Sequence, residues 1–279
     1  MEVKKLLKIA VPAAAFALAA AGVTAYLIAP GKATKAQKLP FLGRNIAHRG
    51  LHRADRSVPE NSLPAFAAAA EAGYGIELDV HLTADGRLAV FHDDGLLRMC
   101  GVPEKLEDLT YDELKKFRLA GTQERIPLLG EVLSLVGGRV PIILELKRGR
   151  NNRLLCERAY EMICAYEGDL CVESFDPMIV RWFRRHAPEV LRGQLSCTEE
   201  AFGKSLREPR SFVLAHLLTN FLCRPQFIAY GITKRKPLTV RLCERMGAMR
   251  VAWTSRSRVN EENSDVVIFE YYRPEKRFK

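Results

Sequence analysis

The chain has 279 residues and a mass of 31.4 kDa, which suits one domain of ordinary size with a short appendage. Its 48% hydrophobic and 27% charged residues are typical of a globular protein and exclude wholesale disorder, collagen and a coiled coil. The formal net charge of +10 is unevenly distributed, because residues 1–44 hold seven Lys and Arg and only one acidic residue. The basic excess thus belongs mainly to the N-terminus, which argues against a nucleic-acid partner.

The N-terminal segment has the pattern of a membrane anchor. Residues 9–30 carry no charge, and at about 1.5 Å per residue they make a helix of roughly 30 Å, enough to cross a hydrocarbon core. A cleaved signal peptide or a buried core helix is the alternative, but no clear small-x-small cleavage site follows and lysines flank both ends. We predict a single-pass membrane anchor over residues 1–30, a basic linker over 31–43, and a globular domain over 44–279.

The side of the membrane that the domain faces is less clear from the sequence. Basic residues stand at both ends of the apolar run in nearly equal number, so the positive-inside rule gives no orientation. The seven cysteines all lie in the domain, form no CxxC pair, and are odd in number, whereas a secreted disulfide framework favours an even number. We therefore expect a reducing, cytoplasm-facing domain.

Short apolar runs alternate with helix-like segments along the domain, which predicts βαβ units and a parallel sheet. Nine strand candidates suit an eight-stranded (β/α) barrel with one extra strand, whereas no glycine-rich fingerprint follows the first strand to favour a doubly wound sheet. In chain order, the expected strands are 45–48, 75–80, 88–91, 141–146, 170–174, 191–195, 227–230, 250–253 and 265–269. The expected helices are 62–72, 111–118, 152–166, 177–187 and 238–246.

Ionisable side chains stand at the ends of the first four predicted strands, whose bodies are otherwise apolar. In a parallel barrel the C-terminal strand ends meet at one mouth, where barrel enzymes have their active sites. Each motif alone is commonly a rim ion pair or surface decoration. Together they predict a functional site, because burying charges without a function is costly. The residues are His48 and Arg49, Glu77 and Asp79, His92, and Glu145 and Lys147.

The residue types indicate the chemistry of this mouth. Glu77, Asp79 and Glu145 offer hard oxygen ligands for a divalent cation, Mg²⁺ or Ca²⁺, and no cysteine or paired-histidine spacing indicates zinc. Arg49 and Lys147 flank these carboxylates and suit an anion such as phosphate.

Two histidines from different strands complete the set. His48 and His92 can serve as general base and general acid across a scissile bond. The combination predicts metal-assisted cleavage of a phosphodiester, with the cation neutralising the phosphoryl oxygen that gains charge. His52 is close enough to the His48 loop to be a further candidate for the pocket lining.

At this point the sequence resembles the glycerophosphodiester phosphodiesterase family. The resemblance covers residues 45–255 and rests on motifs in the family's order and spacing. These are His-Arg-Gly at 48–50, Pro-Glu-Asn-Ser at 59–62, Glu-Leu-Asp-Val at 77–80, Val-Phe-His-Asp at 90–93, Glu-Leu-Lys at 145–147, Ser-Phe-Asp at 174–176 and Trp-Thr at 253–254.

The resemblance implies a (β/α)₈ TIM barrel that hydrolyses glycerophosphodiesters to glycerol 3-phosphate and an alcohol. A neighbouring substrate hydroxyl or water itself would attack phosphorus, and the sequence does not choose between them. Carried over residue by residue, it implies that Glu77, Asp79 and Glu145 hold Mg²⁺ or Ca²⁺, that His48 and His92 are the acid/base pair, that Arg49 and Lys147 contact the phosphate, and that Phe175 and Trp253 shape the glycerol side of the pocket.

The chain departs from the family pattern outside this set. Ser62 replaces the frequent Thr, and Ser-Arg-Ser-Arg at 255–258 follows Trp-Thr. Near the C-terminus, Phe-Glu-Tyr-Tyr-Arg-Pro at 269–274 replaces the family's usual Thr-Asp before a Pro. These changes leave the alcohol-side specificity open, so a lysophospholipase D or another phospholipid phosphodiesterase is one alternative. A catalytically silent, membrane-tethered module that binds phosphodiesters is another, but the intact site set argues against it.

Overall fold

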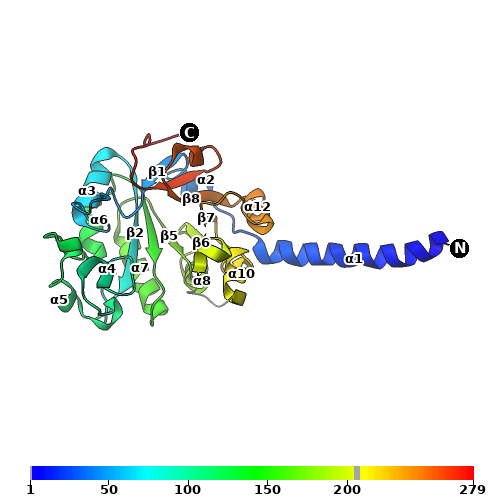
Figure 1. The fold of residues 1–279 in the computed structure, drawn as a ribbon, viewed down its shortest axis with the longest axis horizontal. Helices are drawn as coiled ribbons and strands as arrows, with labels where there is room; N and C mark the ends of the chain where they lie inside the picture. The colour runs from blue at the N-terminus through cyan, green and yellow to red at the C-terminus, as the bar shows by residue number, and fades with distance from the viewer. Residues whose placement is uncertain (1, 204–207) are drawn as a thin grey trace.

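The protein folds as a closed barrel of eight parallel strands (Figure 1). This computed structural model describes residues 2–203 and 208–279, with side chains described for 15–203 and 209–279. The sheet closes because β1 pairs with both β2 and β9. The barrel strands are β1 (Arg44–Ala47), β2 (Gly75–Leu82), β4 (Ile142–Leu146), β5 (Leu170–Ser174), β6 (Arg192–Ser196), β7 (Phe227–Gly231), β8 (Met249–Ser255) and β9 (Val266–Phe269).

Helices connect the strands and cover the outside of the barrel, as the sequence predicts for βαβ units (Figure 1). The α-helices are α1 (Glu2–Ile28), α2 (Lys35–Lys38), α3 (Leu63–Ala72), α4 (Leu97–Cys100), α5 (Tyr111–Leu114), α6 (Leu129–Val136), α7 (Asn152–Ala165), α8 (Pro177–His186), α9 (Glu199–Phe202), α10 (Glu208–Ala215), α11 (Asn220–Cys223) and α12 (Leu238–Arg245). Short 3₁₀ turns are η1 (Leu106–Asp108), η2 (Leu119–Gly121) and η4 (Arg258–Glu261).

One predicted strand, 88–91, is not a strand of the barrel. β3 (Leu88–Val90) runs antiparallel to the end of β2, with Val90 opposite Val80. The expectation that this segment is a parallel strand ending at the mouth is therefore wrong. Its end still returns to the mouth, because β2 extends beyond the barrel and β3 folds back along it. The backbone N–H of Phe91 accordingly donates to the carbonyl oxygen of Asp79 at 3.0 Å.

Side chains alternate between the barrel interior and the helix layer, as strand geometry requires. Ile143 and Cys171 point inward and pack with Phe41, which precedes β1 and is 2% exposed. Ile142 and Leu144 point outward into a core shared with α3, α6 and α7. Apolar side chains thus fill the barrel interior toward the N-terminal ends of the strands. The polar inward positions lie toward the C-terminal ends.

Most of the predicted helices form close to the expected bounds. The segment 111–118 is the exception, because α5 ends after a single turn at Leu114. α3 shows why the sequence is informative: Ser62 caps it, Pro64 stands in its first turn, and Gly73 ends it in the left-handed conformation. The short helix α6 has no counterpart among the predicted segments.

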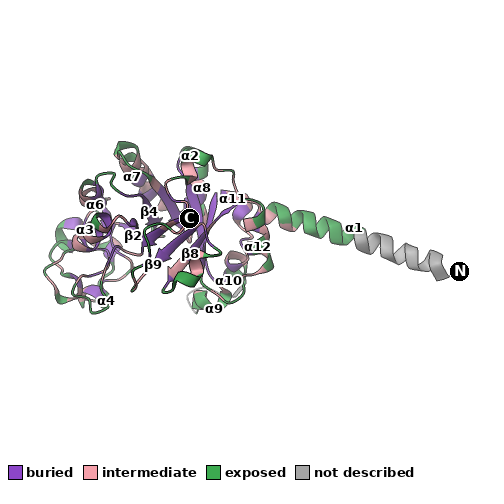
Figure 2. Cartoon of the chain, turned by 90° about the horizontal axis from the view of Figure 1, so that it is seen from above, coloured by how far each residue is buried: buried purple, intermediate pink, exposed green. Residues whose placement is uncertain are grey.

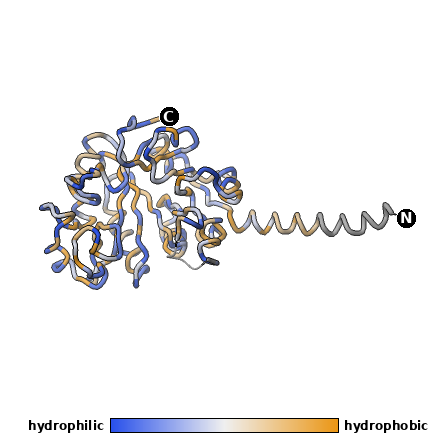
Figure 3. The backbone as a smooth tube through the Cα atoms, viewed as in Figure 1, coloured by the Kyte–Doolittle hydropathy of each residue, from blue (hydrophilic) through white to orange (hydrophobic). Residues whose placement is uncertain are grey.

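The N-terminal helix α1 projects from the barrel, and the part of it with described side chains contacts α11 and α12 at its C-terminal end (Figures 1 and 3). Its described side chains, from residue 15 onward, are mostly exposed, whereas Ile28 is buried against the barrel (Figure 2). Within the described part of the chain, we find no helix both long and apolar enough to cross a membrane. The predicted anchor over 1–30 lies partly outside the described side chains, which begin at residue 15.

Candidate active site

Four buried carboxylates line the inner face of the barrel near its C-terminal end. Asp79 on β2, Glu145 on β4 and Glu173 on β5 stand at matching positions on neighbouring strands. Glu77 lies on the same face of β2, and all four residues are at most 7% exposed. Oxygen atoms of Glu77, Asp79 and Glu145 lie within 4.8 Å of one another. The structure therefore brings together the three residues that the sequence indicates as metal ligands.

Two cations pair with these carboxylates, as the sequence led us to expect. The Nζ of Lys147 lies 2.8 Å from Asp79 Oδ1 and 2.6 Å from Glu145 Oε1. The Nε of Arg49 lies 3.3 Å from Asp79 Oδ2, and the backbone N–H of Arg49 donates to Glu77 Oε2 at 3.0 Å. With Glu173 included, two cations face four carboxylates, so the fully ionised cluster has a net negative charge.

Burial and mutual repulsion shift the pKa values of these carboxyl groups. Burial is the main cause that raises the pKa of Glu77 well above its usual range, and Asp79 and Glu145 add to the effect. Burial likewise raises the pKa of Glu173. Burial acts in the same direction on Asp79, but Lys147 and other nearby cations outweigh it and hold its pKa well below the usual range.

The donor set of this cluster fits a hard divalent cation. All of its donor atoms are carboxylate oxygens, and oxygen atoms are the ligands that Mg²⁺ and Ca²⁺ prefer. The Oε2 atom of Glu173 is buried without a hydrogen-bond partner, a costly arrangement that a nearby cation would relieve. The residues that would hold such an ion are Glu77, Asp79 and Glu145, with Glu173 beside them.

The loop after β1 brings Arg49 into the mouth in an unusual backbone conformation. Arg49 and Asn61 have positive φ angles of 53° and 54°, which few non-glycine residues adopt. Both are held by hydrogen bonds: the backbone N–H of Asn61 donates to Arg49 O at 3.0 Å, and its Nδ2 donates to Asp79 Oδ2 at 2.8 Å. At Gly50, with φ of 79°, a Cβ atom would meet the backbone of α3 at 2.8 Å, so only glycine lets the loop pack there.

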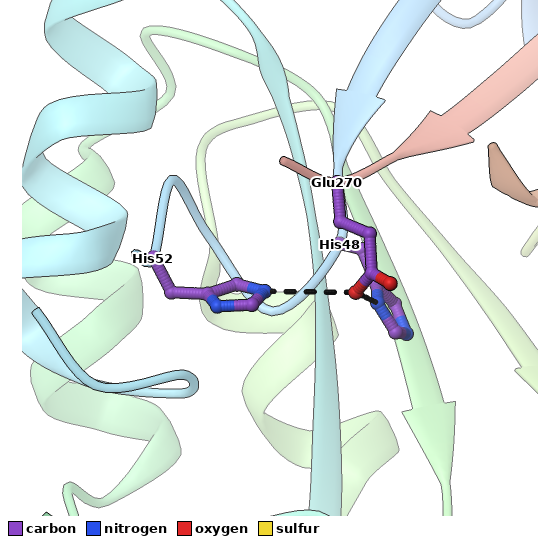
Figure 4. A group of neighbouring side chains, drawn as sticks. All are labelled: His48, His52 and Glu270. Atoms are coloured by element: carbon purple, nitrogen blue, oxygen red, sulfur yellow. Dashed lines mark hydrogen bonds and ion pairs between the residues drawn. The ribbon is translucent and has the colours of Figure 1, made fainter. Parts of the chain in front are cut away.

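His48 stands between the carboxylate cluster and Glu270. Its Nε2 is 3.9 Å from Glu77 Oε2, and its Nδ1 is 3.1 Å from Glu270 Oε2 (Figure 4). Burial lowers the pKa of His48 to about 4, although the hydrogen bond with Glu270 acts to raise it. The neutral ring therefore donates its Nδ1–H to Glu270 and keeps a lone pair on Nε2, on the side of the cluster.

His92 reaches the mouth from the β2–β3 hairpin and is tied to Arg49 by a chain of polar contacts. Its Nδ1 is 2.6 Å from Asp93 Oδ1, and Arg98 Nε donates to Asp93 Oδ2 at 2.6 Å. Arg98 Nη2 also donates to Glu60 Oε1 at 2.7 Å, and the same oxygen accepts from Arg49 Nη1 at 2.7 Å. The two histidine-bearing segments are thus fixed relative to each other.

The two aromatic residues expected on the glycerol side form one pair. Phe175, directly after β5, and Trp253, on β8, have ring centroids 5.6 Å apart at an angle of 87°, an edge-to-face contact. The indole N–H of Trp253 donates to Ala229 O at 3.0 Å, which fixes the ring. Their contact with a substrate remains a prediction.

Sequence analysis did not single out several residues of the site. Glu173 had a detectable signal, because it is a lone carboxylate in an apolar strand next to the strand of Glu145. Glu270 had little signal, since its contact with His48 depends on the pairing of the first strand with the last. The ion pairs of Glu60 and Arg98 join segments 38 residues apart and follow only from the folded loops.

Comparison with known proteins places this geometry in a family. A model described as the glycerophosphoryl diester phosphodiesterase family matches residues 48–271. The chain belongs to this family. It is 34% identical over 167 residues to a glycerophosphodiester phosphodiesterase of Caldanaerobacter subterraneus, covering 54% of this chain and 65% of the relative. It is 34% identical over 160 residues to a lysophospholipase D of Rattus norvegicus, covering 52% of this chain and 49% of the relative.

Solved structures agree with the barrel fold. A phosphodiesterase of Oleispira antarctica, in complex with sn-glycerol-3-phosphate, aligns with a TM-score of 0.66 at 22% identity, covering 82% of this chain and 93% of that one. A glycerophosphodiester phosphodiesterase of Thermotoga maritima aligns with a TM-score of 0.61 at 27% identity, covering 81% and 93%. These alignments confirm the TIM barrel. The matches to the two curated relatives span about half to two thirds of each relative's length.

Proposed function

We propose that this protein hydrolyses glycerophosphodiesters to glycerol 3-phosphate and an alcohol in a reaction that depends on a divalent cation. The observation that carries the proposal is the mouth itself, where three clustered carboxylates, two cations and His48 lie together. His92 directly follows Phe91, whose backbone N–H donates to Asp79 O. Family membership and relatives that bear this activity support the same reaction class.

The cationic side chains of the proposed site recognise the phosphodiester. Lys147 and Arg49 are held by Asp79, so each presents a fixed positive charge at the rim of the cluster. Glu77, Asp79 and Glu145 would hold the cation, which when bound supplies charge neutralisation for the phosphoryl oxygens. The acidic cluster alone would repel an anionic substrate, which explains why the proposed activity needs the ion.

The histidines move the protons. In our proposal, His48 accepts a proton at Nε2 from the attacking hydroxyl, either of water or of the substrate itself, while Glu270 holds its Nδ1–H. The new P–O bond forms as the bond to the leaving alcohol breaks. His92, whose Nδ1 lies 2.6 Å from Asp93 Oδ1, returns a proton to the alcohol oxygen.

The products of glycerophosphocholine turnover test the proposal. The full-length protein with Mg²⁺ is expected to release glycerol 3-phosphate and choline, both resolved by ³¹P and ¹H NMR. A transient cyclic phosphate signal would indicate attack by the substrate hydroxyl. Release of phosphocholine and glycerol, or no turnover by a folded and metal-loaded protein, would contradict the proposed reaction.

Lysophospholipids are a second candidate substrate class. A relative with 34% identity is a lysophospholipase D, and this activity breaks the same type of phosphodiester bond. Lysophosphatidylcholine offered beside glycerophosphocholine distinguishes the two. A higher kcat/KM on lysophosphatidylcholine would indicate that the physiological substrate is a membrane lipid. Turnover of glycerophosphocholine alone would exclude lysophospholipids as substrates.

We also propose that the N-terminal helix holds the barrel at a lipid bilayer with its domain on the cytoplasmic side. The uncharged run over residues 9–30 and the exposure of Phe16, Leu18 and Val23, between 59% and 77%, support this arrangement. Flotation of the full-length protein with liposomes, but not of a chain that begins at residue 24, is the expected result. Equal flotation of both would contradict it.

A further inference from the structure

We propose that His48, His52 and Glu270 form a second metal site, which binds a transition-metal ion such as Zn²⁺ and is distinct from the carboxylate cluster. The three residues each offer one ligand atom, and these atoms lie within 4.8 Å of one another. Figure 4 shows the Glu270 carboxylate between the two imidazole rings.

Strand pairing brings the three side chains together. Ala47 and Phe269 are register partners on β1 and β9, so the next residues, His48 and Glu270, leave neighbouring strand ends side by side. His52 comes from the loop that follows β1, where its ring packs edge-on against Tyr271 at 5.1 Å. The site is therefore supported by two strand ends and one aromatic contact.

The distance between His52 and Glu270 suits a shared ion better than a hydrogen bond. His48 Nδ1 and His52 Nε2 lie 3.1 Å and 3.8 Å from the same oxygen, Glu270 Oε2. Zinc bound to nitrogen and oxygen at about 2.0–2.2 Å with tetrahedral geometry separates its ligand atoms by roughly 3.4 Å. His52 Nε2 is too far from Glu270 for a hydrogen bond, and the small adjustment needed for coordination would close the gap.

Among the described residues, the Nε2 atom of His52 has no hydrogen-bond partner, although its ring contacts Tyr271. The His52 side chain is only 6% exposed, and its Nε2 is buried. Such an atom is costly to bury, so a ligand at this point would satisfy it. Arg256 binds the other oxygen of Glu270, Oε1, at 2.6 Å and so leaves Oε2 turned toward the rings.

The ligand types decide which ion is favoured. Two imidazoles and one carboxylate suit zinc and other late first-row ions, whereas the all-oxygen cluster suits Mg²⁺ or Ca²⁺. A pocket of about 390 Å³ opens beside the site, lined by His52 and Glu270 among others. This pocket gives an ion a route from solvent and leaves room for water as a fourth ligand.

Occupation of this site would inhibit the activity proposed above, and this consequence rests on that proposed function. A metal bound to Nδ1 of His48 would need the lone pair of that nitrogen, so the proton that Nδ1 donates to Glu270 would move to Nε2. His48 then has no lone pair facing the carboxylate cluster and can no longer accept a proton there. Zinc is therefore expected to lower kcat at saturating Mg²⁺.

Metal titration of the full-length protein tests the site without any activity assay. Zn²⁺ affinity is measured by calorimetry with excess Mg²⁺, and Co²⁺ by visible absorption, which is stronger in a four-coordinate imidazole site than in an octahedral oxygen site. We expect His52→Gln to weaken binding at least about 100-fold, the upper end of what loss of an outer-shell partner costs. His186→Gln, on an exposed histidine of α8, is the matched control and should bind as the wild type does.

A variant that is expected to bind zinc more tightly separates loss of the site from general misfolding, because a misfolded protein would not bind more tightly. Arg256→Gln removes a positive charge from Glu270 and should tighten Zn²⁺ binding. Equal affinity in wild type and His52→Gln, or no binding by a folded wild type, would overturn the site. If the protein binds zinc but hydrolyses no phosphodiester, the proposed function is overturned and the proposed zinc site stands. Hydrolysis that His52→Gln makes insensitive to zinc is the result expected if both hold.

Discussion

At the scale of single residues, the contact between His48 and Glu270 decides which nitrogen of the ring is available for chemistry. The carboxylate accepts the Nδ1–H and leaves Nε2 free, so Glu270 acts as a positioning residue.

Substitution of Glu270 by Gln tests this positioning. The amide no longer fixes the Nδ1–H tautomer, so we expect kcat to fall by about 10–100-fold while KM changes little. The acid limb of the pH profile should also move to lower pH, because Glu270 acts to raise the pKa of His48, which burial has lowered to about 4. Glu161→Gln, on the exposed face of α7, is the control. An unchanged acid limb would contradict the assignment.

Glu173 provides a test of the electrostatics of the cluster in metal-free protein. Since burial raises its pKa, the folded protein keeps a proton that the unfolded chain releases above its ordinary pKa of 4.5. This carboxyl group therefore lowers the free energy of unfolding as pH rises from 4.5 toward the raised folded-state pKa. In EDTA, Glu173→Gln should be more stable than wild type by about 1–3 kcal/mol at pH 8 and by less at pH 5. Urea titrations at both values that show the variant less stable at pH 8 would contradict this.

Ionisable residues that interrupt an apolar strand could be predicted as site residues from the sequence. Residues whose place in the site depends on contact with a distant segment could not. Glu77, Asp79 and Glu145 are visible because each interrupts an apolar strand. The sequence does not predict the grouping of His48 and His52 with Glu270, because Glu270 is more than 200 residues away and joins them only when β9 closes the barrel.

At the scale of elements, the start of α3 connects helix capping to the site. The buried hydroxyl of Ser62 donates to Pro59 O at 2.6 Å and accepts from the backbone N–H of Ala65. Its neighbour Asn61 holds Asp79. A loosened helix start is therefore expected to disturb the carboxylate cluster.

We expect Ser62→Ala to lower the free energy of unfolding by about 1–2 kcal/mol, as loss of an N-cap hydroxyl does. Activity should fall as well, because Asn61 loses its support. Ser62→Thr, which restores the family's usual residue and keeps the hydroxyl, is the matched control in the same urea titrations. Equal loss in both variants would show that side-chain volume and not the hydroxyl matters here.

The β2–β3 hairpin shows the limit of pattern recognition at this scale. The apolar run over 88–91 has the composition of any buried strand, so its antiparallel direction is invisible in the sequence. Only the short connection, Thr83 to Arg87, hints at a hairpin, and Thr83 Oγ1 there donates to Asp85 at 2.6 Å. The barrel strands themselves were predictable because their alternation with helices repeats.

At the scale of the whole molecule, residues that follow most of the proposed anchor pack on the barrel. Ile28 and Phe41 are buried, Asn220 Nδ2 donates to Ile28 O at 3.1 Å, and Gln226 Nε2 donates to Lys32 O at 3.0 Å. The linker predicted over 31–43 thus packs on the barrel, although its basic composition gives no sign of this.

Two truncations separate the proposed anchor from the residues that stabilise the fold. A chain that begins at residue 24 keeps these contacts and should unfold at the same temperature as the full-length protein in detergent. A chain that begins at residue 44 loses Phe41 and should be less stable by about 3 kcal/mol or more. Equal stability of both truncated chains would support the domain boundary at residue 44 and contradict a structural role for the linker.

The most direct test of the account is the metal dependence of glycerol 3-phosphate release from glycerophosphocholine. We predict release with Mg²⁺ or Ca²⁺, none in EDTA, and a loss of about 100-fold or more in both His48→Ala and Glu77→Gln. His186→Ala should behave as wild type. Undiminished release in EDTA, or from a folded Glu77→Gln variant, would contradict the central claim that the carboxylate cluster and His48 form one hydrolytic site.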